Sequence, residues 1–188
     1  MWVTGLILPD VSRRSFLKTG LVVGAGLTFG VPTLLKAAPL VERTLYLYNQ
    51  HTGEWFKQVY KAAGEYDPDA LKLLSHIMRD RRTGKEHPMN PALYDLLDKL
   101  HTPFGSHRPL ELVCGYRSAE TNKKLRSAGR GVAKNSLHMS GRAVDVRLQG
   151  VKLSKLRDAA RSLRLGGVGF YPKSNFVHVD IREKPYYW

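Results

Sequence analysis

The sequence has little cysteine and a shortage of acidic residues. Its 188 residues include one cysteine, Cys114, so no internal disulfide can form and stability has to come from packing. We expect this thiol to be buried rather than to act as a nucleophile. No internal repeat or low-complexity segment occurs, which excludes a repeat architecture. The length fits one domain with a core of its own.

Acidic residues number 16 against 30 lysines and arginines, so the formal net charge is +14. Residues 1–38 hold four of the cations and one acid, which leaves a net charge of about +11 on the remainder. A strongly basic domain attracts polyanions. In the cytoplasm that would favour nucleic acid. Outside the inner membrane it favours the cell-wall polymer, with its peptide carboxylates, or lipid head groups, although clusters such as Lys123-Lys124 are equally explained as solvated surface.

The first 38 residues have the three-part layout of an export signal. Residues 12–18, SRRSFLK, fill every position of the twin-arginine motif, an apolar stretch follows over 19–35, and Ala37 and Ala38 precede Pro39. We predict a cleaved signal over 1–38 and a mature domain over 39–188, carried into the periplasm by the twin-arginine export machinery. The alternative is an uncleaved anchor, and the protein would then contact the membrane only through this segment. An exported domain has little access to nucleic acid, so we expect no nucleic-acid partner.

Periodicity along residues 39–188 predicts an α+β domain, in which a central antiparallel sheet is flanked by helices. Asp67-Pro68 and Asn90-Pro91 each combine a capping side chain with a proline suited to the first helical position. The other expected elements are a hairpin over 45–48 and 55–60, strands over 110–114, 142–148, 166–171 and 176–181, a helix over 120–126 capped by Ser118, and a helix capped by Ser154 and ending near Leu165.

Three residues carry the strongest chemical signal. Alternation places Asp145 and His178 on strand faces opposite to aliphatic neighbours, where an unpaired charge would be costly. His138 lies on the loop that enters the first of these strands, and Gly141 allows the backbone to turn between them. Two imidazoles and a carboxylate suit a catalytic zinc with an open fourth position, which lowers the pKa of bound water to about 7. The alternative from these residues alone is an Asp–His ion pair.

The pattern His138-x-x-Gly141-x-Ala143-x-Asp145 with a late histidine resembles the zinc peptidases that include lysostaphin, the D-alanyl-D-alanine peptidases and the hedgehog domain. Three further segments, 115–118 (GYRS), 130–134 (RGVAK) and 166–178 (GGVGFYPKSNFVH), look like the exported murein endopeptidases of the MepK type. The resemblance covers nearly the whole chain. It implies a hedgehog/D-Ala-D-Ala-peptidase-like fold, zinc held by His138, Asp145 and His178, and hydrolysis of peptide crosslinks in peptidoglycan.

The resemblance also assigns a role to Arg117, which matches the family arginine that binds the substrate carbonyl or carboxylate. A guanidinium has a fixed charge and can stabilise the oxyanion formed when an amide is attacked. The general base is less clear. Many members of the wider group place Glu three residues before the last histidine, and here that position is Asn175. Asp180 remains, either as the base or as a residue that orients His178.

We therefore expect a periplasmic zinc metallopeptidase that cuts peptidoglycan crosslinks, with Asp180 and Arg117 as its catalytic residues. Two alternatives stay open: a non-catalytic peptidoglycan-binding scaffold, suggested by the absent glutamate, and a carboxypeptidase that trims stem peptides. The aromatic side chains near the C-terminus could line a cleft or pack the domain edge, and packing is favoured; they are Tyr171, Tyr186, Tyr187 and Trp188.

Overall fold

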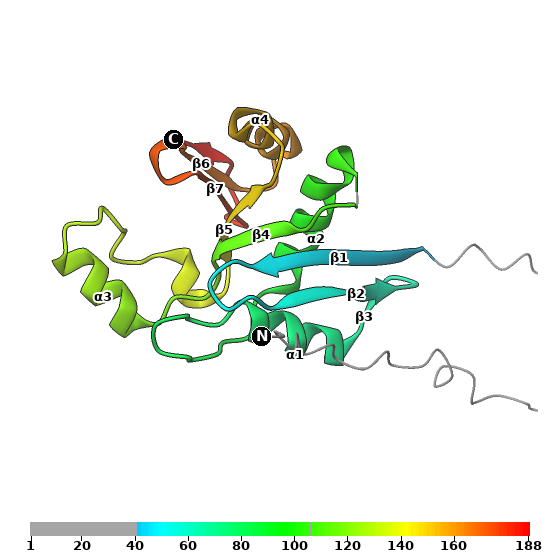
Figure 1. Cartoon of the computed structure of the whole chain (residues 1–188), viewed down its shortest axis with the longest axis horizontal. Coiled ribbons are helices and arrows are strands. Elements are labelled where there is room, and N and C mark those ends of the chain that lie inside the picture. The colour runs from blue at the N-terminus through cyan, green and yellow to red at the C-terminus, as the bar shows by residue number, and fades with distance from the viewer. Residues whose placement is uncertain (1–40, 106) are drawn as a thin grey trace, which may run out of the picture. The chain divides into compact units, whose positions relative to one another are not determined.

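One eight-stranded sheet organises residues 41–105 and 107–188, which are the residues that the computed structural model describes. The strand order is β3-β2-β1-β4-β5-β7-β6-β8 (Figure 1). The strands are β1 (Glu42–Asn49), β2 (Trp55–Ala62), β3 (Glu65–Tyr66), β4 (Leu110–Cys114), β5 (Ala143–Leu148), β6 (Gly167–Tyr171), β7 (Phe176–Asp180) and β8 (Tyr186–Tyr187). The predicted export signal lies outside the described residues.

The α+β prediction is confirmed, but the sheet is mixed rather than purely antiparallel. β1 pairs with β4 in parallel, and β6 pairs with β8 in parallel. The parallel pairing of β1 with β4 follows from the long segment of chain that connects these strands. Two helices separate β1 and β2 from β4, so the chain returns to the edge of the hairpin in the same direction. Local hairpin signals could not reveal this long-range pairing.

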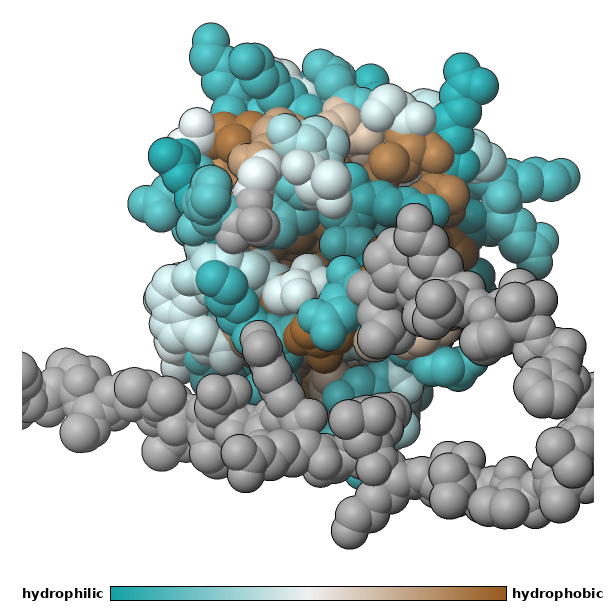
Figure 2. Space-filling model, turned by 90° about the vertical axis from the view of Figure 1, so that its right-hand side faces the viewer, coloured by the Kyte–Doolittle hydropathy of each residue, from teal (hydrophilic) through white to brown (hydrophobic). Residues whose placement is uncertain are grey.

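Three helices and the sheet enclose a single aliphatic core. The α-helices of the described residues are α1 (Pro68–Ile77), α2 (Pro91–His101), α3 (Ala119–Ser127) and α4 (Leu153–Leu163). α1 packs on β2, α2 packs on β1 and α4, and α4 packs on β5, β6 and β7. Their apolar stripes meet the inward residues of the strands. In the face shown in Figure 2, hydrophilic side chains surround smaller apolar patches.

The helix starts follow from their capping residues. Asp67 accepts hydrogen bonds from the backbone N–H groups of Asp69 and Ala70, and Asn90 accepts one from Ala92, as predicted. Ser118 caps α3 through the N–H of Thr121. The prediction for α4 was wrong: it begins at Leu153, and its N-cap residue, Lys152, makes no side-chain capping bond. Burial of Leu156 and Ala160 against the strands therefore sets the position of α4.

The other face of the sheet carries the polar residues that matter for function. A 3₁₀ turn, η2 (Leu137–Ser140), leads into β5 and contacts it. Two more 3₁₀ turns, η1 (Thr102–Phe104) and η3 (Pro172–Ser174), follow α2 and β6. Within the described ranges, no helix is long and apolar enough to cross a membrane.

Candidate metal centre

The register of β5 and β7 brings Asp145 and His178 together. These residues are direct cross-strand partners in the antiparallel pair, so their side chains leave the same face of the sheet as neighbours. His178 Nδ1 lies 2.8 Å from Asp145 Oδ1. Asp145 is 5% exposed. The adjacent Val144 and Val146 point into the core, as the alternation along the strand predicted.

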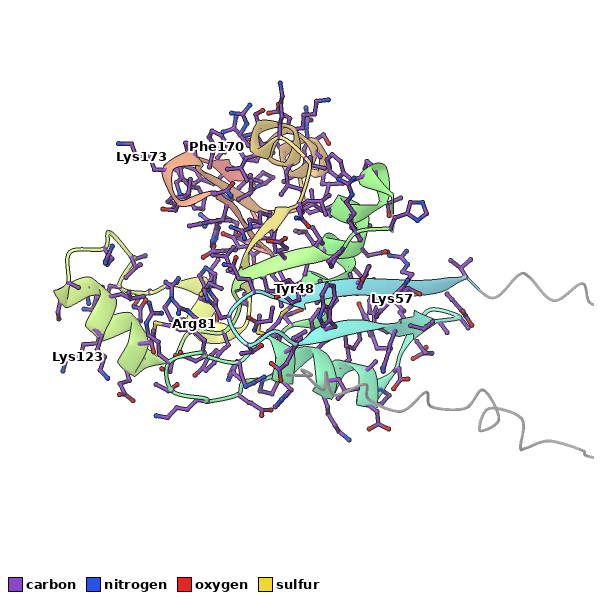
Figure 3. All side chains as sticks on the ribbon, in the orientation of Figure 1. Tyr48, Lys57, Arg81, Lys123, Phe170 and Lys173 are labelled. Atoms are coloured by element: carbon purple, nitrogen blue, oxygen red, sulfur yellow. The ribbon has the colours of Figure 1, made fainter. Side chains whose placement is uncertain are left out.

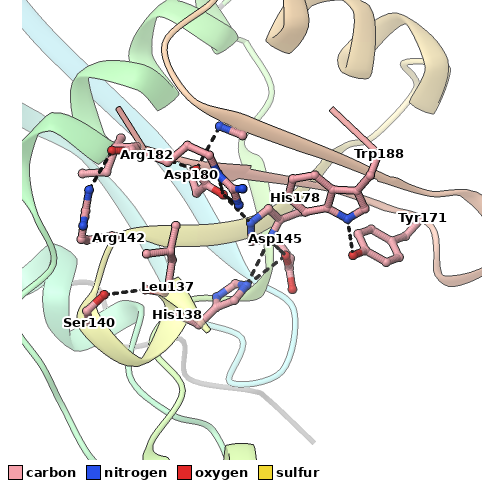
Figure 4. Close-up of polar contacts among 12 residues, drawn as sticks. Leu137, His138, Ser140, Arg142, Asp145, Tyr171, His178, Asp180, Arg182 and Trp188 are labelled. Carbon is pink, nitrogen blue, oxygen red and sulfur yellow. Dashed lines mark hydrogen bonds and ion pairs between the residues drawn. The ribbon is translucent and has the colours of Figure 1, made fainter. Parts of the chain in front are cut away.

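His138 reaches the same carboxylate from η2. Its Nε2 lies 3.2 Å from Asp145 Oδ1 and 3.2 Å from His178 Nδ1 (Figure 4). The turn ends at Gly141, which has a φ of 65°. A Cβ at that position would lie 2.6 Å from the carbonyl oxygen of Pro88, so no side chain fits there. Glycine is therefore required both for the backbone conformation and for the close approach of the preceding loop.

In each imidazole, the ring nitrogen that points away from the cluster makes a hydrogen bond, and this bond fixes which nitrogen faces the cluster. His138 Nδ1 lies 2.8 Å from the carbonyl oxygen of Gly115, which can only accept, so Nδ1–H donates and Nε2 faces Asp145. His178 Nε2 lies 3.2 Å from Asp180 Oδ2 and donates to that carboxylate, so Nδ1 faces the cluster. Metal-binding histidines are typically held in this way.

The donor set fits a small divalent cation. The three facing atoms, His138 Nε2, Asp145 Oδ1 and His178 Nδ1, are separated by 2.8–3.2 Å. Ligand atoms around a tetrahedral zinc, with bonds of about 2.0–2.2 Å, lie roughly 3.3 Å apart. A small expansion of the cluster would therefore suffice. Two nitrogens and one oxygen form the kind of ligand set that leaves a position free for chemistry.

The same proximity couples the protonation of these groups. Burial lowers the pKa of His138, but the Asp145 carboxylate and Cys114 together raise it to about 10. Burial also opposes ionisation of Asp145, yet His138 holds the pKa of that carboxyl well below its usual range. In the absence of a cation the pair is therefore ionic. Because metal ligands must be deprotonated, a bound cation would replace the imidazolium proton.

Cys114 also belongs to this cluster, and the sequence analysis gave it no metal role. It ends β4 as the cross-strand partner of Asp145, next to a register shift. One ligand atom from each of Cys114, His138 and Asp145 lies within 4.8 Å of the others. The thiol is half-buried rather than buried as expected. Burial raises its pKa, but His138 and the Arg117 guanidinium together lower it, so the pKa lies below the ordinary thiol value.

Arg117 lies beside the cluster. Its residue is 8% exposed. One guanidinium nitrogen is 3.9 Å from Asp145 Oδ2 and donates to Cys114 Sγ at 3.5 Å. Its Nε has no hydrogen-bond partner among the described residues. A buried donor without a partner is costly, so this group is suited to an acceptor supplied by a ligand.

Asp180 lies on the far side of the His178 ring and is fully buried. Oδ1 accepts from the backbone N–H groups of Gly167 at 2.9 Å and Arg182 at 3.0 Å, while Oδ2 accepts from the Arg182 guanidinium. Burial opposes its ionisation, but the bonds from His178, Arg182 and the backbone hold the pKa of Asp180 well below its usual range. These contacts favour orientation of His178 over proton transfer.

Trp188 covers the outer side of His178 (Figure 4). The two ring centroids are 5.3 Å apart, and the indole N–H donates to the Tyr171 hydroxyl at 2.8 Å. A Cβ on Gly169 would lie 2.8 Å from the indole, so the glycine allows this packing. Tyr171 and Trp188 are 37% and 39% exposed. They therefore both pack the domain edge and form a wall at the cluster, two alternatives that the sequence left open.

Comparison with known proteins agrees with this geometry. The family described as peptidoglycan L,D-endopeptidase MepK matches residues 37–184, and the twin-arginine translocation signal family matches residues 10–30. The peptidoglycan L,D-endopeptidase MepK of Escherichia coli (strain K12) is 41% identical over 171 residues, which cover 91% of this chain and 94% of the relative. The probable counterpart from Haemophilus influenzae is 40% identical over 177 residues, covering 91% and 92%. No solved structure matches significantly.

Proposed function

The chain belongs to the MepK family of peptidoglycan L,D-endopeptidases, and we propose from this premise that it hydrolyses peptide crosslinks of peptidoglycan in the periplasm. The matched twin-arginine signal accounts for its export. The observation that supports catalysis is the cluster of His138, Asp145 and His178, in which three potential ligand atoms lie 2.8–3.2 Å apart. A scaffold that only bound peptidoglycan would not need this arrangement.

We propose zinc as the metal and His138, Asp145 and His178 as its ligands. The two imidazoles are each fixed by a second hydrogen bond, whereas Cys114 is contacted by the Arg117 guanidinium. If the thiolate also bound the metal, four protein ligands would close the site, which is the arrangement of structural zinc. When bound, zinc would supply Lewis-acid activation of water and of the scissile carbonyl.

The protein's own residues would position and stabilise the reacting groups. Arg117 would donate from its guanidinium to the oxyanion that forms at the scissile carbonyl, in a site where its Nε has no partner among the described residues. Gly115 O and Asp180 would keep His138 and His178 in the correct orientation. We therefore assign Asp180 a positioning role rather than that of the general base, because its carboxylate is saturated by Arg182 and backbone N–H groups.

The experiment compares the purified exported protein with His138→Ala and with His107→Ala, a matched control at an exposed histidine. Each is incubated with intact sacculi, and released muropeptides and bound metal are measured by mass spectrometry. We expect the parent and the control to remove crosslinked dimers and to bind one zinc per chain, and His138→Ala to do neither. Bound zinc without cleavage would support the scaffold, and trimmed monomers with intact dimers would support the carboxypeptidase.

A further inference from the structure

A pocket beside the metal centre has four arginines among its lining residues. Three segments form its walls: the turn after β1, the loop after α1 and the end of β4 with the residues that follow. Figure 3 shows Arg81 on the loop after α1. The polar lining residues used below are Asn49, His51, Arg79, Arg81, Arg82 and Arg117, and we call this cavity the arginine pocket.

The charges around the arginine pocket do not cancel. Arg79 is paired with Glu54 at 2.8 Å. Arg81 and Arg82, by contrast, have no acidic group within 4.0 Å among the residues that the structure describes. Burial lowers the pKa of His51, and the positive charges of Arg81 and Arg82 lower it further, which is consistent with positive potential inside the pocket.

One carboxylate, Asp80, also lines the pocket, but its oxygens are already occupied. Oδ2 accepts from the Ser118 backbone N–H at 2.9 Å and from the Ser118 hydroxyl at 2.7 Å. Oδ1 accepts from the backbone N–H of Arg82 at 2.9 Å. Asp80 therefore serves the local fold, and the guanidinium groups of Arg81 and Arg82 remain available to a ligand.

The arginine pocket adjoins the metal centre. Cys114 and Arg117 line the pocket, and the Cys114 sulfur lies within 4.8 Å of the ligand atoms of His138 and Asp145. A group bound in the pocket would therefore lie beside a bond held at the cluster. Arg117, proposed above to face the scissile carbonyl, thus lies between the cluster and the guanidinium groups of Arg81 and Arg82 in this lining.

We propose that the arginine pocket binds a free carboxylate of the substrate peptide, next to the bond that is cut. This proposal rests on the proposed function, because the peptide stems of peptidoglycan supply the carboxylates. Guanidinium groups match the planar, two-oxygen geometry of a carboxylate and keep their charge at any physiological pH. The pocket would therefore select peptides with a free carboxylate near the scissile bond and reject those in which it is amidated.

The test uses metal-loaded protein, two substrates and two double variants. The substrates are a crosslinked peptide with free carboxylates and the same peptide with those carboxylates amidated. The pocket variant is Arg81→Gln/Arg82→Gln. The matched control is Lys152→Gln/Lys155→Gln, which removes the same charge from exposed residues at the start of α4. Thermal unfolding checks that both variants are folded.

For the pocket variant we expect KM for the free-carboxylate substrate to rise roughly tenfold, the size expected for losing a charge-assisted hydrogen bond, with kcat changed much less. The control should keep the parent KM. With the amidated substrate, the parent, the control and the pocket variant should all have the same KM, higher than the parent KM for the free-carboxylate substrate. Equal effects of the two variants would mean that only long-range attraction operates, and equal use of both substrates by the parent would mean that no carboxylate is recognised. Either result overturns the proposal.

A binding measurement separates this proposal from the proposed function. If the parent binds zinc and cuts neither substrate, that result contradicts the endopeptidase activity alone. Calorimetry with an uncrosslinked stem peptide then still tests the pocket. We expect the parent to bind the free-carboxylate peptide roughly tenfold more tightly than the amidated peptide, and the pocket variant to lose the difference. Equal affinity of the parent for both peptides would contradict the pocket.

Discussion

The two faces of β5 and β7 differ in what their side chains contact. On one face Val146 and Val177 are fully buried against aliphatic neighbours. On the other, Asp145 and His178 contact each other and further polar groups, and Trp188 packs on the outer side of the imidazole. The backbones of β5 and β7 thus carry core residues on one face and site residues on the other. Because strand residues alternate, a change on one face should affect stability and a change on the other should affect chemistry.

Asp145→Asn should give the largest effect on the polar face. Loss of the charged ligand should reduce activity by more than the roughly 100-fold typical of residues that only orient a ligand. Without metal, the variant should also be less stable than the parent at pH 7, because the raised pKa of His138 keeps a stabilising ion pair in the parent that the variant lacks. Activity on sacculi, bound zinc and urea unfolding measure these effects. Zinc binding and activity close to those of the parent would contradict the role of Asp145 as a ligand.

Leu148→Ala tests the other face of the same strand. Leu148 is 4% exposed and lies opposite Leu110 in the sheet. Its truncation should lower the free energy of unfolding by about 2–5 kcal/mol. The metal content and kcat of the folded fraction should stay close to those of the parent. Urea unfolding and zinc analysis provide the check, and a selective loss of zinc would show that the core face also controls the site.

Asp180→Asn sharpens the comparison, because this carboxylate lies on the polar face but does not face the cluster. If it orients His178, zinc affinity should fall by about 10–100-fold, and saturating zinc should restore much of kcat. A general base would behave differently: zinc affinity would be retained, and kcat would stay low at any zinc concentration. Zinc titration combined with kcat measurement distinguishes the two roles.

Asp80→Asn should give the smallest effect, since Asp80 serves structure alone. Burial raises the pKa of this carboxyl, but the Ser118 hydroxyl and further hydrogen bonds lower it to about 2. A depressed pKa stabilises the fold above pH 4, and that contribution is lost as the pH falls from about 4 to about 2. The variant should be less stable by about 1–2 kcal/mol at pH 7 and should lose less stability on acidification. Urea unfolding at pH 7 and pH 3 checks both parts.

The polar face was largely predictable because it depends on local alternation. The sequence placed Asp145, His178 and Asp180 away from the aliphatic residues, and both strands have that orientation. The proximity of Asp145 and His178 could be predicted only by assuming that their two strands are neighbours in the sheet. The position of Cys114 in the cluster with His138 and Asp145 could not be predicted, because it depends on a register shift between β4 and β5. The saturation of Asp180 depends on Arg182, which folds back after β7.

The helix-covered face was predictable in outline but not in its connections. Proline and capping residues located the starts of α1 and α2, because their effect is local. The start of α4 is set by packing on three strands, so the local signal at Ser154 was misleading. The parallel pairing of β1 with β4 depends on a contact between segments more than sixty residues apart, which periodicity does not report.

The packing of Trp188 on His178 constrains how the protein can be tagged for purification. The indole lies 5.3 Å from the imidazole, measured between ring centroids. A polyhistidine tag joined after Trp188 would start beside the cluster and could compete with His138 and His178 for zinc. An amino-terminal tag would precede the twin-arginine signal and interfere with export. A short affinity epitope inserted in an exposed loop, such as that around Gly131, avoids both problems.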